Sequence, residues 1–196
     1  QFFTNVSHEF RTPLTLMLGP LETVLGDMQH KLAPEHRKNL ELAYGNMLRL
    51  ERLVNSLLDF SRLEAGKTKA NFRPTDLAQL TYSLSHNFES AAKAAMIGYD
   101  VNVEAIGESV YVDTGFWEKI VLNLLSNALR HTFNGSISIR LKREDNNAKF
   151  VVKDTGAGIP KEDLPHLFER FYRVHDVKSR SNEGTGIGLA LVRELI

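Results

Sequence analysis

The residues with the clearest chemical capacity are a histidine, a carboxylate and a hydroxyl near the start of the chain, His8, Glu9 and Thr12. Residues that suit a buried helix face recur around them at alternating spacings of three and four, which predicts one amphipathic helix. That row consists of Phe3, Val6, Phe10, Pro13, Met17, Pro20 and Val24. His8 then falls outside the row, with Thr12 one turn further on the same face. We therefore expect an exposed imidazole that another domain can reach, as a group-transfer nucleophile requires.

A second set of polar residues occupies a helical pattern in the middle of the chain. Asn123 and Asn127 are i, i+4 neighbours opposite an apolar face, and Arg130 and His131 follow within one turn. Amide oxygens suit Mg²⁺, which prefers oxygen ligands, and the two basic side chains could reach phosphates. The alternative is an ordinary solvated helix face.

Asp154 ends an apolar run that reads as a strand, and Gly156 and Gly158 follow it. A carboxylate at a strand end can accept a hydrogen bond from an exocyclic amine such as that of adenine. The glycines permit positive φ and a close approach to a ring. The alternative is a strand-to-loop turn capped by aspartate.

A further glycine cluster, Gly184, Gly186 and Gly188, leads directly into an apolar helix. Free backbone amides and the helix dipole converge there on an anion. The spacing differs from the dinucleotide fingerprint, and the lysine and hydroxyl of a phosphate-binding P-loop are missing.

The elements that must carry these residues fall into two parts. Residues 1–66 read as two long helices joined by a short connection through 31–34, which form a hairpin. A single hairpin leaves apolar surface uncovered, so we expect it to dimerise into a four-helix bundle. The alternative is a hairpin docked on its own chain.

Residues 67–73 read as a linker, and 74–196 as an α+β layer with helices on one face of a sheet. Helices are predicted at 76–96, capped by Asp76, at 114–131 and from 189 to the end of the sequence. Strands are predicted at 99–104, 110–112, 136–143 and 149–154.

Composition excludes several classes of protein. The chain has 24 basic and 24 acidic residues, so no basic excess favours nucleic acid or direct membrane contact. With no cysteine it has neither disulfides nor thiolate zinc sites. The sequence starts and stops inside helical patterns, so we expect a piece of a longer protein that is incomplete at its carboxyl end.

Taken in order, the motifs resemble those of the sensor histidine kinases of two-component signalling. Residues 7–14 resemble that family's H box, 123–132 its N box and 154–160 its first glycine box. The F box is matched by 168–173 and the second glycine box by 184–189. The opening residues 2–15 look most like those of hybrid sensors, which fuse kinase and receiver.

The resemblance implies a fold of the α plus α/β sandwich class: a dimeric helical hairpin, then an ATP-binding domain of the histidine kinase/Hsp90-like type. It implies that His8 is phosphorylated, that Glu9 is its acid/base partner and that Thr12 positions water for a receiver phosphatase activity. The implied cofactors are ATP and Mg²⁺, with Asn127 as the metal ligand. The other implied nucleotide-binding residues are Asn123, Arg130, His131, Asp154, Gly156, Gly158, Arg173, Gly184, Gly186 and Gly188.

The resemblance further implies a homodimer that passes the phosphoryl group to the aspartate of a response-regulator receiver domain. It places the chain in the cytoplasmic portion of a bacterial sensor anchored in the inner membrane. Residues 175–183 would form a mobile ATP lid, with Phe168 and Phe171 as its hydrophobic hinge. Plain core packing of these two side chains is the ordinary interpretation, and both can hold. Two other functions stay open, a degenerate kinase that acts as a dimerisation scaffold and an ATPase of the chaperone, topoisomerase or mismatch-repair type.

Overall fold

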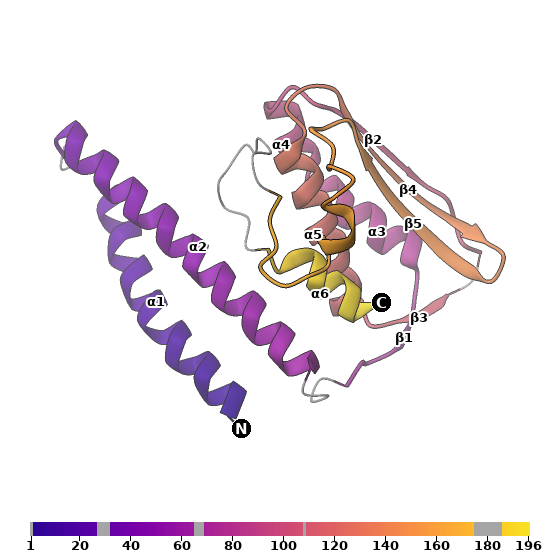
Figure 1. Cartoon of the computed structure of the whole chain (residues 1–196), viewed down its shortest axis with the longest axis horizontal. Helices are drawn as coiled ribbons and strands as arrows, with labels where there is room; N and C mark the ends of the chain where they lie inside the picture. Colours follow the sequence, from indigo (N-terminus) through magenta and orange to yellow (C-terminus); the bar gives the residue numbers. More distant parts are fainter. Residues whose placement is uncertain (1, 27–31, 65–68, 108, 175–185) are drawn as a thin grey trace. The chain divides into compact units, whose positions relative to one another are not determined.

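Two units make up the computed structural model, residues Gln1–Thr68 and Lys69–Ile196 (Figure 1). The structure describes residues 2–26, 32–64, 69–107, 109–174 and 186–196, and within these ranges it does not describe the side chains of 2–12, 60, 62 and 64. Each unit is described by itself.

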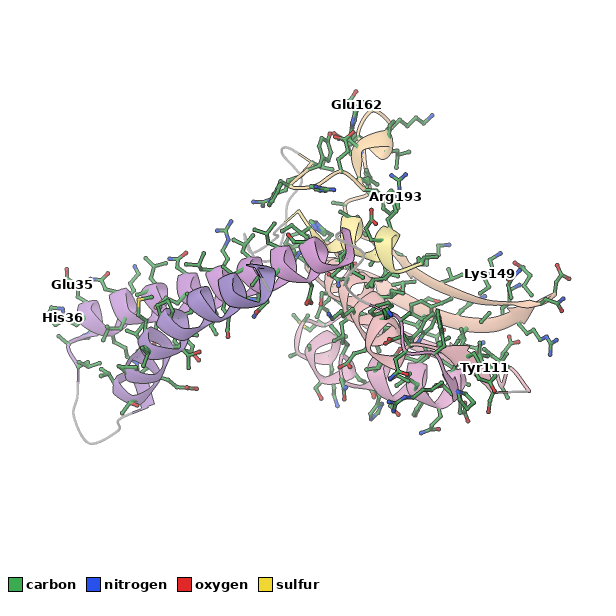
Figure 2. The ribbon with its side chains drawn as sticks, turned by 90° about the horizontal axis from the view of Figure 1, so that it is seen from below. Glu35, His36, Tyr111, Lys149, Glu162 and Arg193 are labelled. Carbon is green, nitrogen blue, oxygen red and sulfur yellow. The ribbon has the colours of Figure 1, made fainter. Side chains whose placement is uncertain are left out.

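The first unit is a hairpin of two helices, α1 (Phe2–Gly26) and α2 (Pro34–Glu64). Proline at the first position of α2 needs no intrahelical donor and presets the helical φ. Glu35 and His36, labelled in Figure 2, lie exposed in its first turn. Arg37 of α2 connects the two helices at this end, because its Nη2 atom donates to the carbonyl of Leu25 in α1 at 3.3 Å. The predicted hairpin is confirmed.

The row of α1 that packs on α2 differs from the predicted one. Leu14 is 3% exposed, and Leu18, Leu21 and Leu25 of the same row are partly buried. The described members of the predicted row, Pro13, Met17, Pro20 and Val24, are exposed. The predicted row, which was expected to suit a buried face, is therefore not the one that the single chain buries against α2. Helix α1 carries two apolar stripes, and one hairpin can cover only one of them.

The second unit layers helices on one face of a sheet of order β2-β4-β5 (Figure 1). Strands β2 (Gly98–Val103) and β4 (Ser136–Glu144) are parallel, and β4 pairs antiparallel with β5 (Asn147–Asp154) through a hairpin turn. A separate antiparallel pair joins β1 (Arg73–Thr75), which the sequence did not predict, to β3 (Val110–Val112).

The helices of this layer are α3 (Leu77–His86), α4 (Glu89–Ala94) and α5 (Thr114–His131), and the short 3₁₀ helix η1 (Leu164–His166) and α6 (Gly188–Leu195) follow the sheet. The core between helices and sheet contains Leu84, Ala92, Ile97, Val121, Leu125, Ala128, Ile137 and Ile139. Alternation along β4 sends Ile137, Ile139 and Leu141 inward and Arg140 and Lys142 outward. This agrees with the predicted α+β layer.

The predicted continuous helix over 76–96 is wrong, because it divides into α3 and α4 at Asn87–Phe88. The carbonyl of Ser85 accepts from the amide of Phe88 at 3.1 Å and from the hydroxyl of Tyr99 at 2.7 Å. These bonds shorten the last turn of α3 and tie it to β2. The predicted cap of α3 is confirmed, because Asp76 accepts from the amide of Gln79 at 2.9 Å.

Candidate functional site

Helix α5 is the element that positions four of the predicted site residues. Asp113 caps its start by accepting from the amide of Phe116 at 3.0 Å. Val121 and Leu125 are buried against the sheet, whereas Asn123 and Asn127 on the other face are partly exposed. The amphipathic pattern thus sets the row of amides beside solvent.

The second glycine segment meets α5 at Asn123. A Cβ on Gly188 would lie 2.6 Å from Asn123 Oδ1, closer than side chains allow, so glycine lets α6 begin against this amide. The Asn123 Nδ2 atom donates to the carbonyl of Lys119 at 2.7 Å, which fixes the amide's orientation. Residues 65 positions apart in sequence are thereby brought together.

Asn127 offers a partly exposed amide oxygen. Its Oδ1 atom accepts from Arg130 Nη1 at 3.4 Å, a long contact that a better partner can replace. Among the residues that the structure describes, no group of three or more His, Cys, Asp or Glu side chains could hold a metal ion. A single amide oxygen from the protein is enough for a Mg²⁺ ion that arrives bound to a nucleotide. Such an ion keeps several waters and takes its remaining ligands from the phosphates.

The first glycine segment meets the carboxyl end of α5, whereas Asn123 lies near the middle of this helix. Asp154 ends β5 in an exposed position, and its Oδ1 atom accepts from the amide of Gly156 at 2.8 Å. The amide of Ala157 donates to the carbonyl of His131 at 3.2 Å, and a Cβ on Gly156 would lie 2.4 Å from that oxygen. The turn capped by aspartate is therefore confirmed, and its second carboxylate oxygen stays available to a ligand. Gly158 has a φ of +71°.

Residues 163–173 form a segment that contacts Gly186 of the second glycine segment. The amide of Phe171 donates to the carbonyl of Gly186 at 2.8 Å, and both residues have positive φ, +62° and +70°. Phe168 and Phe171 are 44% and 58% exposed, so the alternative that they are plain core residues is wrong. Arg173 lies exposed two residues further on.

A hydrogen bond within this segment holds the residue before Arg173. The hydroxyl of Tyr172 donates to Asp163, and the Tyr172 ring packs on His166, with ring centroids 5.3 Å apart. The hydrogen bond to Asp163 raises the pKa of Tyr172 to about 12. Figure 2 labels Glu162, which immediately precedes this segment, and Arg193, which lies in α6.

Some predicted site residues lie outside the described parts. Gly184 and the predicted lid at 175–183 are among the residues that the structure does not describe. His8, Glu9 and Thr12 lie in α1, but their side chains are not described. A cavity of about 620 Å³ lies elsewhere in the second unit, between the first turns of α3 and the residues Val103, Ala105, Ile106, Gly107 and Ser109, and is lined by none of the predicted nucleotide residues.

Three residues beside Asp154 were not predicted as part of the site. Thr155, Gly135 and Ser136 connect the end of β5 to the start of β4. The dipeptide Asn134-Gly135 is a common turn signal and could have marked the close approach. No local pattern reveals its partner, because the strand register sets that contact.

Comparison with known proteins agrees with this geometry. Residues 1–66 match the family "His Kinase A (phospho-acceptor) domain", and residues 112–196 match "Histidine kinase-, DNA gyrase B-, and HSP90-like ATPase". Sensor histidine kinase TmoS of Ectopseudomonas mendocina is 38% identical over 200 residues, covering 100% of this chain and 20% of that protein. Hybrid signal transduction histidine kinase D of Dictyostelium discoideum is 37% identical, covering 100% of this chain and 13% of that protein.

Solved structures lead to the same family. The crystal structure of full-length ShkA in complex with AMPPNP superposes with a TM-score of 0.78 at 29% identity, covering 98% of this chain and 40% of that one. The chain belongs to the sensor histidine kinases of two-component signalling. It spans about a fifth or less of the length of the two sequence relatives above. Within the described ranges, no helix combines the length and apolar character needed to cross a bilayer.

Proposed function

We propose that the chain is an ATP-dependent kinase core that phosphorylates His8 and passes the phosphoryl group to a receiver-domain aspartate. The observation that carries the proposal is the meeting of two glycine segments on one helix. Gly156 lies against the carbonyl end of α5 at His131, and Gly188 lies against Asn123. These two points are eight residues apart, about 12 Å along a helix, a length that a nucleoside triphosphate can span.

The two ends of this site differ in chemistry as ATP requires. At one end Asp154 offers a carboxylate oxygen for the amino group of adenine, next to a loop of small residues. Toward Asn123, the site offers the amide oxygen of Asn127, the guanidinium of Arg130, which reaches back to within 3.4 Å of that oxygen, and the free backbone amides of the first turn of α6 for magnesium-bound phosphates. Asn123 supplies an amide where a hydrolytic ATPase needs a base, which favours transfer to a side chain over hydrolysis.

The transfer itself is a displacement at phosphorus. A neutral ring nitrogen of His8 forms the new bond to the γ-phosphorus while the bond to the bridging oxygen breaks and ADP leaves. Glu9 takes the proton from the other ring nitrogen, which keeps the imidazole nucleophilic. The protein contributes mainly by positioning the two groups and neutralising charge. Position 8 shares a helical row of α1 with Thr15, Gly19 and Glu22, which are all exposed.

Homodimerisation through the hairpin is part of the proposal. Large apolar side chains stay exposed on both helices of the single hairpin: Leu16, Met17, Val24, Leu42, Leu50 and Leu57. A second copy would cover them by forming a four-helix bundle. Thr12 is proposed to position water in the reverse, phosphatase activity on the receiver. The location in the cytoplasmic part of a membrane-anchored sensor stays a prediction.

A phosphotransfer experiment tests this function. The chain is incubated with Mg²⁺ and ATP labelled at its γ-phosphate, freed of nucleotide, and mixed with candidate receiver domains. We expect label to move from the kinase to a receiver aspartate, and neither the kinase nor the receiver to be labelled when His8→Ala replaces the wild type. If the chain binds ATP but acquires no label, it is a degenerate kinase that acts as a scaffold.

A further inference from the structure

Thr155, the residue between Asp154 and Gly156, connects the end of β5 to the start of β4. Its amide donates to the carbonyl of Ser136 at 3.1 Å, and its Oγ1 atom accepts from the amide of Ser136 at 2.9 Å. The pair continues the β4–β5 ladder one residue beyond the register Ile137↔Asp154. The side chain of Thr155 therefore supplies an acceptor that secures the last rung of this ladder.

The backbone opposite Thr155, at Gly135, leaves space for this hydroxyl. Gly135 has a φ of +106°, and a Cβ at this position would lie 2.0 Å from Thr155 Oγ1. Only glycine combines that backbone conformation with that space. The hydroxyl also has two carbonyls within its reach, those of Ser136 at 3.4 Å and Asn134 at 3.5 Å. The loop 134–136 and Thr155 thus form one hydrogen-bonded cluster.

This hydrogen-bonded cluster lies directly beside the carboxylate of Asp154, which the proposed function uses. The backbone of Asp154 is held by the neighbouring hydrogen-bonded cluster at Thr155. Its side chain is held by the amide of Gly156, which donates to Oδ1 at 2.8 Å. The amide of Ala157 continues the connection by donating to His131 at 3.2 Å. The backbone around Asp154 is therefore tied to both β4 and α5. Its remaining carboxylate oxygen has a defined position only as long as these ties hold.

We propose that Thr155 is a positioning residue that orients Asp154 toward the amino group of adenine and so contributes to selection of ATP over other purine nucleotides. This inference rests on the proposed function, because it takes Asp154 as the acceptor of that amino group. Thr155 itself does not contact the base in this account. It acts through the position of its neighbour.

The test compares ATP with inosine triphosphate, whose purine carries a carbonyl where adenine has the amino group. Thr155→Val keeps the branched shape and removes the hydroxyl, whereas Thr155→Ser keeps the hydroxyl. We expect Thr155→Val to weaken ATP binding by about three- to tenfold, the range for one hydrogen bond, and to change inosine triphosphate binding by less than about twofold. Thr155→Ser should restore the wild-type ratio of the two affinities.

A matched control removes a similar hydroxyl away from the site. Thr75 Oγ1 donates to the carbonyl of Arg73 at 3.0 Å in β1, so Thr75→Val should leave the affinity ratio unchanged. Urea unfolding followed through Trp117, the chain's sole tryptophan, verifies that each variant is folded. A variant that fails this check is replaced by Thr155→Ala, which is smaller and also lacks the hydroxyl.

Asp154→Asn separates failure of the inference from failure of the proposed function. If Asp154→Asn abolishes the preference for ATP but Thr155→Val weakens both nucleotides equally, the inference is overturned and the proposed role of Asp154 stands. If the wild type binds both nucleotides equally and Asp154→Asn changes nothing, the proposed function of this carboxylate fails, and the inference fails with it.

Discussion

Replacement of Gly186 by alanine tests the contact that joins the segment 163–173 to the second glycine segment. A Cβ at Gly186 would lie 2.7 Å from the carbonyl carbon of Phe171 and 2.8 Å from its Cα, whereas ordinary contact begins at 3.4 Å. The backbones must separate by roughly 0.7 Å, the difference between 3.4 and 2.7 Å. The hydrogen bond between Phe171 and Gly186, now 2.8 Å long, would then lie at or beyond the limit for such bonds.

Gly158 supplies a matched control for this change. Its φ of +71° equals that of Gly186 within a degree, but nothing lies within 4 Å of the Cβ that it would gain. Both alanine variants therefore pay about 1–2 kcal/mol for the left-handed backbone, and both gain equally from a less flexible unfolded chain. Only Gly186→Ala also loses the hydrogen bond, worth about 1 kcal/mol, and strains the contact.

We therefore expect Gly186→Ala to lower the free energy of unfolding by about 1–2 kcal/mol more than Gly158→Ala. The assay is equilibrium unfolding in urea, followed by the fluorescence of Trp117, the only tryptophan in the sequence. Because Trp117 lies in α5, its signal reports on the second unit. Equal losses in the two variants would refute the reasoning, since the steric contact would then contribute nothing.

Three further changes test other parts of the account. Thr81→Val removes the buried hydroxyl that now accepts a hydrogen bond from Trp117 Nε1 at 2.9 Å. The free energy of unfolding, measured by thermal unfolding with circular dichroism, should fall by about 1–3 kcal/mol. An unchanged stability would contradict this expectation. Asp163→Asn should lower the pKa of Tyr172 from about 12 toward its ordinary value of 10, as read from tyrosinate absorbance against a Tyr172→Phe control. Because that pKa is raised in the folded state, the stabilising contribution is full below pH 10 and disappears as pH rises from 10 to about 12; an unshifted titration would exclude the hydrogen bond. Met17→Glu places a charge in the exposed stripe of α1 and should convert a dimer to a monomer in light scattering, whereas a monomeric wild type would refute the proposed bundle.

Much of the fold followed from local pattern. The helix predicted at 114–131 and the strand at 110–112 have the same bounds in the structure, because apolar periodicity determines both; the cap that Asp113 provides for α5 was not predicted. The break between α3 and α4 could not be predicted, since Leu84, Phe88 and Ala92 continue a helical apolar period. It depends on a tertiary contact, the hydroxyl of Tyr99 on the carbonyl of Ser85.

The candidate site divides in the same way. Residue types and spacing in the sequence indicated Asp154 and its following glycines, because a carboxylate and flexible backbone at a strand end have a defined chemical capacity. The reason that Gly156 and Gly188 must be glycine was not local: each faces an atom of α5, His131 O or Asn123 Oδ1. Contacts of this kind depend on how the strands and helices pack, which periodicity alone does not specify.

The stripe on α1 shows a further limit. A three-four repeat indicated one row of α1, but the helix has a second apolar row, and the row containing Leu14 is the one that packs on α2. Composition alone cannot say which row a single chain buries and which one it leaves for a partner.

The most direct test of the central claim is the site and chemical stability of the phosphate that the chain acquires. After incubation with Mg²⁺ and γ-labelled ATP, the account predicts label that is lost in acid, survives alkali and maps to His8. It also predicts that His8→Ala abolishes the label while ATP binding is retained. Label that withstands acid, or that persists in His8→Ala, would contradict the claim that an ATP-loaded second unit phosphorylates this histidine.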